Sequence, residues 1–321
     1  MATNTSPATN VPTISELRTK VRELLQNRET EFNVLVVGRP GSCKSTLINS
    51  MNMALAERWR ELAEFGMGDS NNTLRLDKIP LFEDRFMEEK VEGYMAKVNF
   101  WDCAGIENVS DEAYGEFIGL TLDGKVPDKT TVFASVNKSD KQLMTVRELR
   151  EEFDTVVEEN RFHRLLLLCA ADETVSENLL TLIKTTTSAH KNMGRNIPIF
   201  LAMSKADRIK DDQREYRKRK ETAERLLNLG GNMQRSTELT LYHVAKEGED
   251  GGCDVDVYGK FLQNEDIDKD LLILLINLLD PAFDRGLAYN ENTDIEPEVE
   301  PEPSSEPTGL INKLATFWWK R

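Results

Sequence analysis

The sequence lacks a surplus of positive charge, and this absence excludes one class of function. Its 321 residues include 41 lysines and arginines against 56 aspartates and glutamates, which gives a formal net charge of −15 at pH 7. Proteins that bind nucleic acids normally present a basic surface to the phosphate backbone. We therefore expect no nucleic-acid partner for this chain.

Long apolar runs and paired cysteines are scarce as well. The longest apolar stretch, 271–279, is too short to span a bilayer and is bounded by Asp270 and Asp280. The first residues contain no positive segment followed by an apolar one, so the sequence predicts no secretory signal. The four cysteines are scattered without paired spacing, which favours reduced thiols over disulfide bonds or zinc. We expect a cytoplasmic protein.

Apolar segments alternate with amphipathic and charged ones along most of the chain. An apolar content of 39% is enough for a substantial core. Apolar runs predict strands at 32–37, 74–82, 94–101, 164–170, 197–203 and 239–245. The segments between and around them predict helices at 15–28, 44–64, 140–159, 174–191, 209–229 and 266–279, and 106–140 is interpreted as an irregular insertion with a short helix. This alternation indicates an α/β fold with a mostly parallel sheet and helices on both faces.

Composition divides the chain into four parts. These are an N-terminal tail and short helix (1–30), a main domain (31–287), an acidic proline-rich linker (288–308) and an amphipathic aromatic tail (309–321). In the tail, apolar residues recur on one helical face, and basic residues lie near its end. Residues Leu310–Arg321 therefore suit a membrane surface or a groove on a protein, and both alternatives remain open.

A glycine-rich turn follows a buried apolar run at the start of the main domain. The run Val34–Val37 predicts a parallel strand, and the next residues read Gly38-Arg-Pro-Gly-Ser-Cys43-Lys44-Ser45. This nearly matches G-x-x-x-x-G-K-[ST], in which backbone N–H groups cradle phosphates and the lysine contacts the β and γ oxygens. The mismatch is Cys43, which stands where the motif has its second glycine.

Two further motifs occur later in the chain, and each directly follows a predicted strand. Asp102-Cys-Ala-Gly105 has the form D-x-x-G, in which the carboxylate holds Mg²⁺ through water and the glycine N–H meets the γ-phosphate. Ser204-Lys205-Ala-Asp207 resembles [N/T]-K-x-D, whose aspartate accepts from the N1–H and the amine of guanine. Adenine offers no such pair of donors. Residues 244–246, after the last predicted strand, match a third base-contacting loop.

Taken together, the motifs resemble those of a P-loop GTPase that binds GTP or GDP with Mg²⁺. The resemblance implies three metal-ligating positions, Ser45, Asp102 and the switch threonine, for which Thr73 is our candidate. It also implies a set of nucleotide-binding residues: Gly38, Arg39, Pro40, Gly41, Ser42, Cys43, Lys44, Ser45, Thr46, Gly105, Ser204, Lys205 and Asp207.

A narrower resemblance extends over residues 30–285. The three motifs above, the stretch Gly124-Lys-Val-Pro-Asp128 and the acidic and apolar segment starting at Asp266 look like the interferon-induced protein 44 family. That resemblance implies a cytoplasmic GTPase-like domain that binds GTP and takes part in innate immune defence.

The hydrolytic machinery is incomplete at one position. Ile106 follows Gly105, where Ras-like enzymes carry a glutamine that orients the attacking water, and 102–120 contains no glutamine. The remaining catalytic candidates are Thr73 and Arg39, because an arginine in this loop can act as a finger in some dimerising GTPases. We predict slow intrinsic hydrolysis and a possible homodimer.

Cys43 separates the alternative functions. A non-glycine residue at positive φ costs roughly 1–2 kcal/mol, and about 1.4 kcal/mol corresponds to a tenfold loss of affinity. We therefore predict micromolar GTP or GDP affinity, which Cys43→Gly should tighten. The alternatives are a degenerate, nucleotide-free scaffold and an ATP-using enzyme, and Asp207 argues against the latter.

Overall fold

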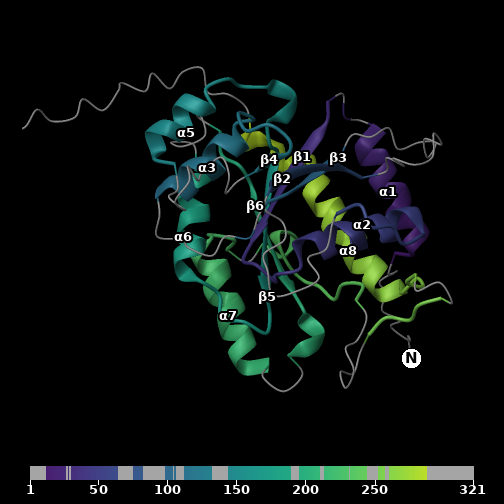
Figure 1. Cartoon of the computed structure of the whole chain (residues 1–321). Helices are drawn as coiled ribbons and strands as arrows, with labels where there is room; N and C mark the ends of the chain where they lie inside the picture. Colours follow the sequence, from purple (N-terminus) through teal and green to yellow (C-terminus); the bar gives the residue numbers. More distant parts are fainter. Residues whose placement is uncertain are drawn as a thin grey trace, which may run out of the picture. The chain divides into compact units, whose positions relative to one another are not determined.

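The computed structural model describes residues 12–26, 28, 30–63, 75–81, 98–103, 105, 112–131, 144–188, 195–209, 213–230, 232–243, 252–256 and 260–287. Within them, seven strands form one sheet in the order β4-β2-β3-β1-β5-β6-β7 (Figure 1). The strands are β1 (Phe32–Gly38), β2 (Arg75–Pro80), β3 (Val98–Asp102), β4 (Thr130–Thr131), β5 (Arg164–Ala170), β6 (Ile199–Ser204) and β7 (Ser236–Glu238).

The pairing of the strands is mostly parallel, as the sequence predicts. β1 lies between β3 and β5, β6 lies between β5 and β7, and all these pairs are parallel. β2 runs antiparallel to β3 and to the short β4. The chain therefore adds antiparallel strands at one edge of an otherwise parallel sheet, a common arrangement in doubly wound α/β folds.

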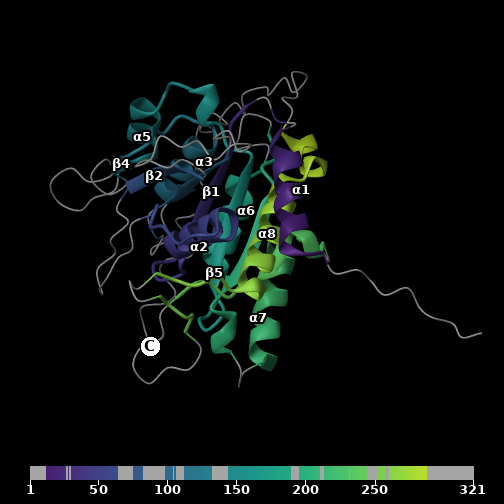
Figure 2. The same cartoon turned by 90° about the vertical axis from the view of Figure 1, so that its right-hand side faces the viewer.

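Helices cover the two faces of the sheet (Figures 1 and 2). One face carries α1 (Ile14–Gln26), α2 (Lys44–Ala56) and α8 (Glu265–Leu279). The other carries α3 (Glu112–Leu122), α5 (Val146–Glu152), α6 (Glu177–Thr186) and α7 (Gln213–Leu226). Short 3₁₀ turns are η1 (Glu158–Asn160), η2 (Ala206–Arg208), η3 (Met233–Arg235) and η4 (Pro281–Gly286).

The central strands are buried on both sides, which explains their unbroken apolar runs. In β1, Leu35 and Val37 join the core under α3 and α6, whereas Val34 and Val36 join the core under α2 and α8. Successive side chains of a strand point to opposite faces, so a strand covered by helices on both faces needs apolar residues at every position. The predicted α/β architecture is confirmed.

Two predicted helices are too long. Helix α2 ends at Ala56 instead of continuing to 64, because Glu57 adopts a left-handed conformation with φ 60° and its N–H bonds to the Met53 carbonyl. Within the described residues 144–159, the helix expected at 140–159 is α5, which begins at a capping box formed by Thr145 and Glu148 and ends before Phe153.

The prediction of a last strand at 239–245 is wrong for 239–243, the part of it that the structure describes. Strand β7 ends at Glu238, and the next N–H, that of Leu239, bonds to the Met203 carbonyl. The described residues after it leave the sheet, and Leu241 and Tyr242 are buried against α2 and α8. The apolar pattern there reflects helix packing rather than strand pairing.

Within 106–140, the predicted short helix is α3, and its side chains form part of the core. Several predicted features lie outside the described residues: Thr73, Ile106, residues 244–246, the linker 288–308 and the tail Leu310–Arg321. No helix in the described part of the chain is both long and apolar enough to cross a membrane.

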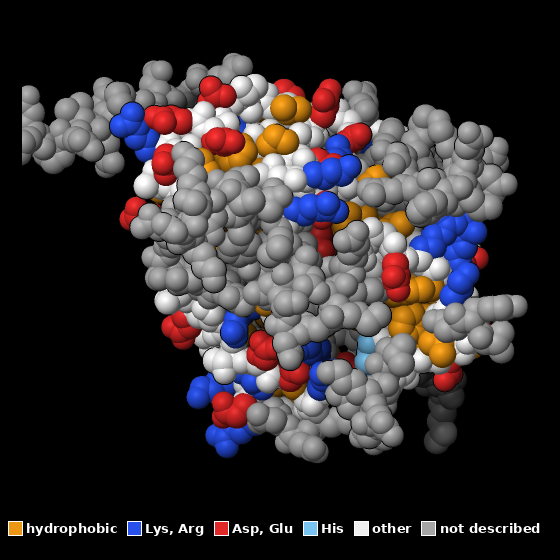
Figure 3. Space-filling view, viewed as in Figure 1, with side chains coloured by type: hydrophobic (Ala, Val, Ile, Leu, Met, Phe, Trp, Pro, Cys, Tyr) orange, Lys and Arg blue, Asp and Glu red, His pale blue; other side chains and the backbone are white. Residues whose placement is uncertain are grey.

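The charged run in α7 is part of a mixed surface. Basic and acidic side chains intermingle at the lower left of the space-filling view, where Figure 1 places α7 (Figure 3). Lys220 of this helix pairs with Glu238 at 2.7 Å. The basic residues there alternate with acidic ones, as on an ordinary solvated helix face.

Candidate functional site

The phosphate-loop sequence forms the turn between β1 and α2. Gly38 ends the strand, and a Cβ at this position would lie 2.4 Å from the Leu168 carbonyl oxygen. Gly41 has φ +76°, a conformation that glycine adopts without strain. The loop therefore needs its glycines for two reasons, a close strand contact at Gly38 and a left-handed turn at Gly41.

Cys43 occupies the left-handed position immediately before α2. Its φ is 69° and its ψ 32°, and its Sγ donates to the Gly41 carbonyl at 3.7 Å. This confirms that the place of the second motif glycine requires positive φ in this chain. A side chain in that conformation costs roughly 1–2 kcal/mol. The loop keeps this geometry although a cysteine replaces the motif glycine, because the packing of the surrounding fold offsets the strain.

Lys44 and Ser45 begin helix α2 and turn their polar groups toward the loop and the neighbouring strand. The Lys44 ammonium donates to the Arg39 carbonyl at 3.1 Å and to the Gly38 carbonyl at 3.4 Å. Ser45 Oγ donates to Asp102 Oδ2 at 2.6 Å. The predicted metal-ligating pair Ser45 and Asp102 is thus brought together from separate motifs.

Burial shifts the titration of these two charged groups. It raises the pKa of Asp102 to about 6, against the opposing effects of the Ser45 hydroxyl and the Lys44 ammonium. It also lowers the pKa of Lys44, although Asp102 opposes this shift. Each charged form is penalised because its neighbours replace water incompletely. An anion beside Lys44 and a cation beside Asp102 would offset those penalties.

The D-x-x-G turn packs against the phosphate loop. Asp102 ends β3, and a Cβ at Gly105 would lie 2.6 Å from Pro40 N and 2.7 Å from Pro40 Cγ. Only a glycine allows the turn to approach the loop this closely without displacing it. The second motif is therefore held at the same edge as the first.

The base motif lies at the end of β6. The buried Ser204 hydroxyl donates to the Ser42 carbonyl at 3.0 Å, which ties this motif to the phosphate loop. Lys205 is left-handed with φ 57°, and Asp207 lies in the short turn η2. Asp207 Oδ2 is 3.8 Å from His243 Nε2, and the two side chains are 22% and 25% exposed.

Two acidic residues that the sequence reasoning missed lie between these motifs. Glu173, in the turn after β5, is 3.5 Å from both Arg39 and Lys205, and Asp172 is 3.4 Å from Lys205. A general rule could have found them, because ligands in open α/β sheets bind beyond the carboxyl ends of strands, and these residues follow β5 directly. Through these ion pairs, the two carboxylates hold Arg39 and Lys205 close to the carboxyl end of β5.

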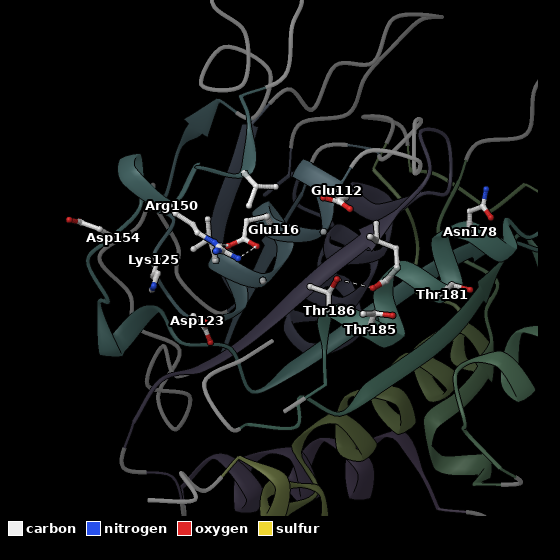
Figure 4. Close-up of a pocket in the computed structure, with 15 residues that line it drawn as sticks. Glu112, Glu116, Asp123, Lys125, Arg150, Asp154, Asn178, Thr181, Thr185 and Thr186 are labelled. Carbon is white, nitrogen blue, oxygen red and sulfur yellow. Dashed lines mark hydrogen bonds and ion pairs between the residues drawn. The ribbon is translucent and has the colours of Figure 1, made fainter. Parts of the chain in front are cut away.

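A cavity of about 880 Å³ lies elsewhere, between α3, α5 and α6 (Figure 4). Arg150 donates to the two carboxylate oxygens of Glu116 at 2.7 and 3.1 Å. Asp123 also lines the cavity, and burial raises its pKa to about 6. None of the residues that line the cavity belongs to the three sequence motifs.

Known proteins resemble this chain only distantly. No protein-family model matches the sequence, and no curated protein matches it significantly. Similar solved structures include Toc33 from Arabidopsis thaliana as a dimerization-deficient mutant, with Mg²⁺ and GMPPNP, and with GDP and Mg²⁺. Their identities are 15%, 14% and 17%, and their TM-scores 0.45, 0.44 and 0.44. The matches cover 82%, 83% and 85% of this chain and 91%, 92% and 94% of the others.

Such values assign no family, and no family model or curated protein links the chain to the interferon-induced protein 44 family. The fold follows from the chain's own topology: β1, the glycine-rich loop and α2 stand in sequence at the middle of a mostly parallel sheet. The chain has the α/β fold of P-loop NTPases.

Proposed function

We propose that this chain is a G domain that binds GTP or GDP together with Mg²⁺. One observation carries the proposal: Lys44, the Ser45–Asp102 pair and Asp207 come from separate strands and converge at one edge of the sheet. Parallel α/β sheets bind ligands at this edge. Asp207 favours guanine over adenine because a carboxylate accepts the two adjacent N–H groups of guanine.

The residues fit a hydrated divalent cation. Asp102 Oδ1 is buried and has no hydrogen-bond partner among the described residues, while Oδ2 accepts from Ser45. A buried carboxylate oxygen without a donor is costly, and a metal-bound water would supply one. Ser45 would ligate the metal directly and Asp102 through water. When bound, Mg²⁺ neutralises charge on the β- and γ-phosphates.

Other residues of the phosphate loop would bind the phosphates. Lys44 would contact the β and γ oxygens, Thr46 would face the α-phosphate, and the loop N–H groups would hold the anion in place.

Intrinsic hydrolysis is slow under this proposal, since Ile106 replaces the water-orienting glutamine. Arg39 is 48% exposed and forms an exposed ion pair with Glu173, a weak contact that a second copy in a homodimer could replace.

A second candidate function is a nucleotide-free scaffold. The observation that favours it is Cys43, which occupies the place of the second motif glycine in a strained backbone conformation.

Two wider proposals rest on sequence pattern alone. The motif order that resembles the interferon-induced protein 44 family supports a cytoplasmic role in innate defence, and the pattern of Leu310–Arg321 supports contact with a membrane surface or a protein groove.

Nucleotide titration tests the main proposal. The purified full chain is titrated with GTP, GDP and ATP by isothermal calorimetry, with and without Mg²⁺. We expect micromolar affinity for the guanine nucleotides, tighter binding with Mg²⁺ and much weaker ATP binding. Absence of heat with every nucleotide would favour the scaffold, and equal affinity for ATP and GTP would contradict the role of Asp207.

A further inference from the structure

His243 faces the base-recognising carboxylate, although it belongs to none of the sequence motifs. Its Nε2 lies 3.8 Å from Asp207 Oδ2, and the two side chains remain partly exposed. Lys205 and Arg208, which lie close to Asp207 in the chain, pair with Asp172 on the adjacent turn. His243 and Asp207 therefore lie side by side beyond the end of β6, and both side chains keep some contact with solvent.

The backbone around His243 determines which ring nitrogen carries the proton. His243 Nδ1 lies 2.9 Å from the Leu241 carbonyl oxygen, and a carbonyl only accepts. Nδ1 must therefore be the donor, so in the neutral ring Nε2 has no proton and acts as an acceptor. Neutral His243 and ionised Asp207 then present two acceptors to each other with no donor between them.

The backbone that carries the His243 ring is held by hydrogen bonds from several elements. The Leu239 N–H bonds to the Met203 carbonyl of β6, and the Tyr242 N–H bonds to Ser50 Oγ of α2. The Cys253 N–H donates to the His243 carbonyl at 2.9 Å. The arrangement of two facing acceptors is thus a property of the packed fold and not of a free loop.

Guanine offers three donor hydrogens on its N1–C2 edge, one on N1 and two on the exocyclic amine. A carboxylate at the Asp207 position takes the N1–H and one amine hydrogen. The second amine hydrogen needs another acceptor, and a nitrogen atom can lie within hydrogen-bond reach of two acceptors that are 3.8 Å apart.

We infer that His243 is a second specificity-determining residue of the base site, whose neutral Nε2 accepts from the exocyclic amine of guanine beside Asp207. This inference rests on the proposed function, because it concerns the same base. His243 would strengthen the discrimination between guanine and hypoxanthine, which Asp207 alone makes less strongly. Hypoxanthine keeps the N1–H but lacks the amine.

The test compares GDP with inosine diphosphate, which differs from GDP only by the missing amine. Affinities are measured by calorimetry with Mg²⁺ for the wild type and for His243→Phe, which keeps an aromatic ring without an acceptor. We expect His243→Phe to lower the GDP/IDP affinity ratio by about three- to tenfold, as loss of one neutral hydrogen bond predicts. IDP affinity should stay unchanged.

His243→Gln is the matched control, because its amide oxygen can replace Nε2 as acceptor and should restore most of the ratio. An unchanged ratio in His243→Phe with intact GDP binding would overturn the inference and leave the proposed function standing. No binding of GDP or IDP by the wild type would overturn the proposed function and the inference with it.

A measurement on the wild type keeps the inference testable if a variant misfolds. In protein labelled with ¹⁵N-histidine, the Nε2 resonance of His243 should move when GDP is added and move much less with IDP. The same Nε2 shift with GDP and IDP would overturn the inference, since the exocyclic amine would then not reach the ring.

Discussion

The phosphate end and the base end of the candidate site are built in opposite ways. At the phosphate end most polar groups are paired within the protein: Lys44 donates to loop carbonyls, and Ser45 donates to Asp102 Oδ2, while Asp102 Oδ1 has no partner among the described residues. At the base end, Asp207 Oδ2 and His243 Nε2 face each other at 3.8 Å. The two ends are linked by the hydrogen bond from Ser204 to the Ser42 carbonyl.

This difference predicts how each end would recognise a nucleotide. A phosphate must compete with hydrogen bonds that Lys44 already makes, so its gain is the difference between two sets of charged contacts. A base that brings N–H donors would meet the two acceptors that we infer for Asp207 and His243. The phosphate end should therefore dominate affinity, and the base end should dominate discrimination.

The largest effect should come from the phosphate end. Lys44→Ala removes the buried ammonium, and losing one partner of a buried charged pair costs about 2–5 kcal/mol. GTP and inosine triphosphate affinities should fall together by about 30-fold or more. Calorimetry measures this, with Lys125→Ala at the distant cavity as the control. A loss confined to GTP would contradict the division between the two ends.

The base end should change selectivity more than overall affinity. Asp207→Asn should weaken GDP binding by about 10- to 100-fold, since a hydrogen bond to a charged group contributes about 1.5–3 kcal/mol. The same variant should gain affinity for xanthosine diphosphate, whose second oxygen accepts from the asparagine amide. Competition binding with the two nucleotides checks this. Asp123→Asn, in the cavity under α3, should leave both affinities unchanged.

A smaller effect is expected from relieving the strain at Cys43. Cys43→Gly removes the Cβ from the left-handed position and should raise the free energy of unfolding by about 0.5–1 kcal/mol, after allowance for the greater entropy of unfolded glycine. Urea denaturation measures it, and GTP affinity should tighten in parallel. Cys43→Ala keeps the Cβ and should show neither gain. Equal stability of the glycine and alanine variants would mean that φ 69° is not strained here.

The smallest effect should come from outside the nucleotide edge. Arg150→Ala breaks the pair with Glu116 at the cavity, where the arginine side chain is 61% exposed. Stability should fall by less than about 1 kcal/mol, as for other exposed ion pairs. Thermal unfolding and GDP titration measure the two quantities. A weaker GDP affinity in this variant would show that the cavity and the nucleotide edge are coupled.

Sequence patterns predicted the strands that build the middle of the sheet and missed the ends of several elements. The runs at 32–37 and 164–170 became β1 and β5 because strands buried on both faces need apolar residues throughout. The helix expected to reach 64 ends at Ala56, since the left-handed conformation of Glu57 is not encoded by periodicity. Beyond Leu239, the apolar residues Leu241 and Tyr242 pack in the core with α2 and α8 instead of pairing in the sheet.

By itself, the sequence determined the phosphate loop, the D-x-x-G and base motifs and their order, since local chemistry and spacing carry that information. Only the tertiary structure decided that Ser45 meets Asp102 at 2.6 Å, that Gly105 packs on Pro40, and that His243 faces Asp207. The physical reason is that parallel strands bring their carboxyl ends to one edge, whatever the distance between them along the chain. Which side chains then meet depends on loop packing, and no sequence spacing records that.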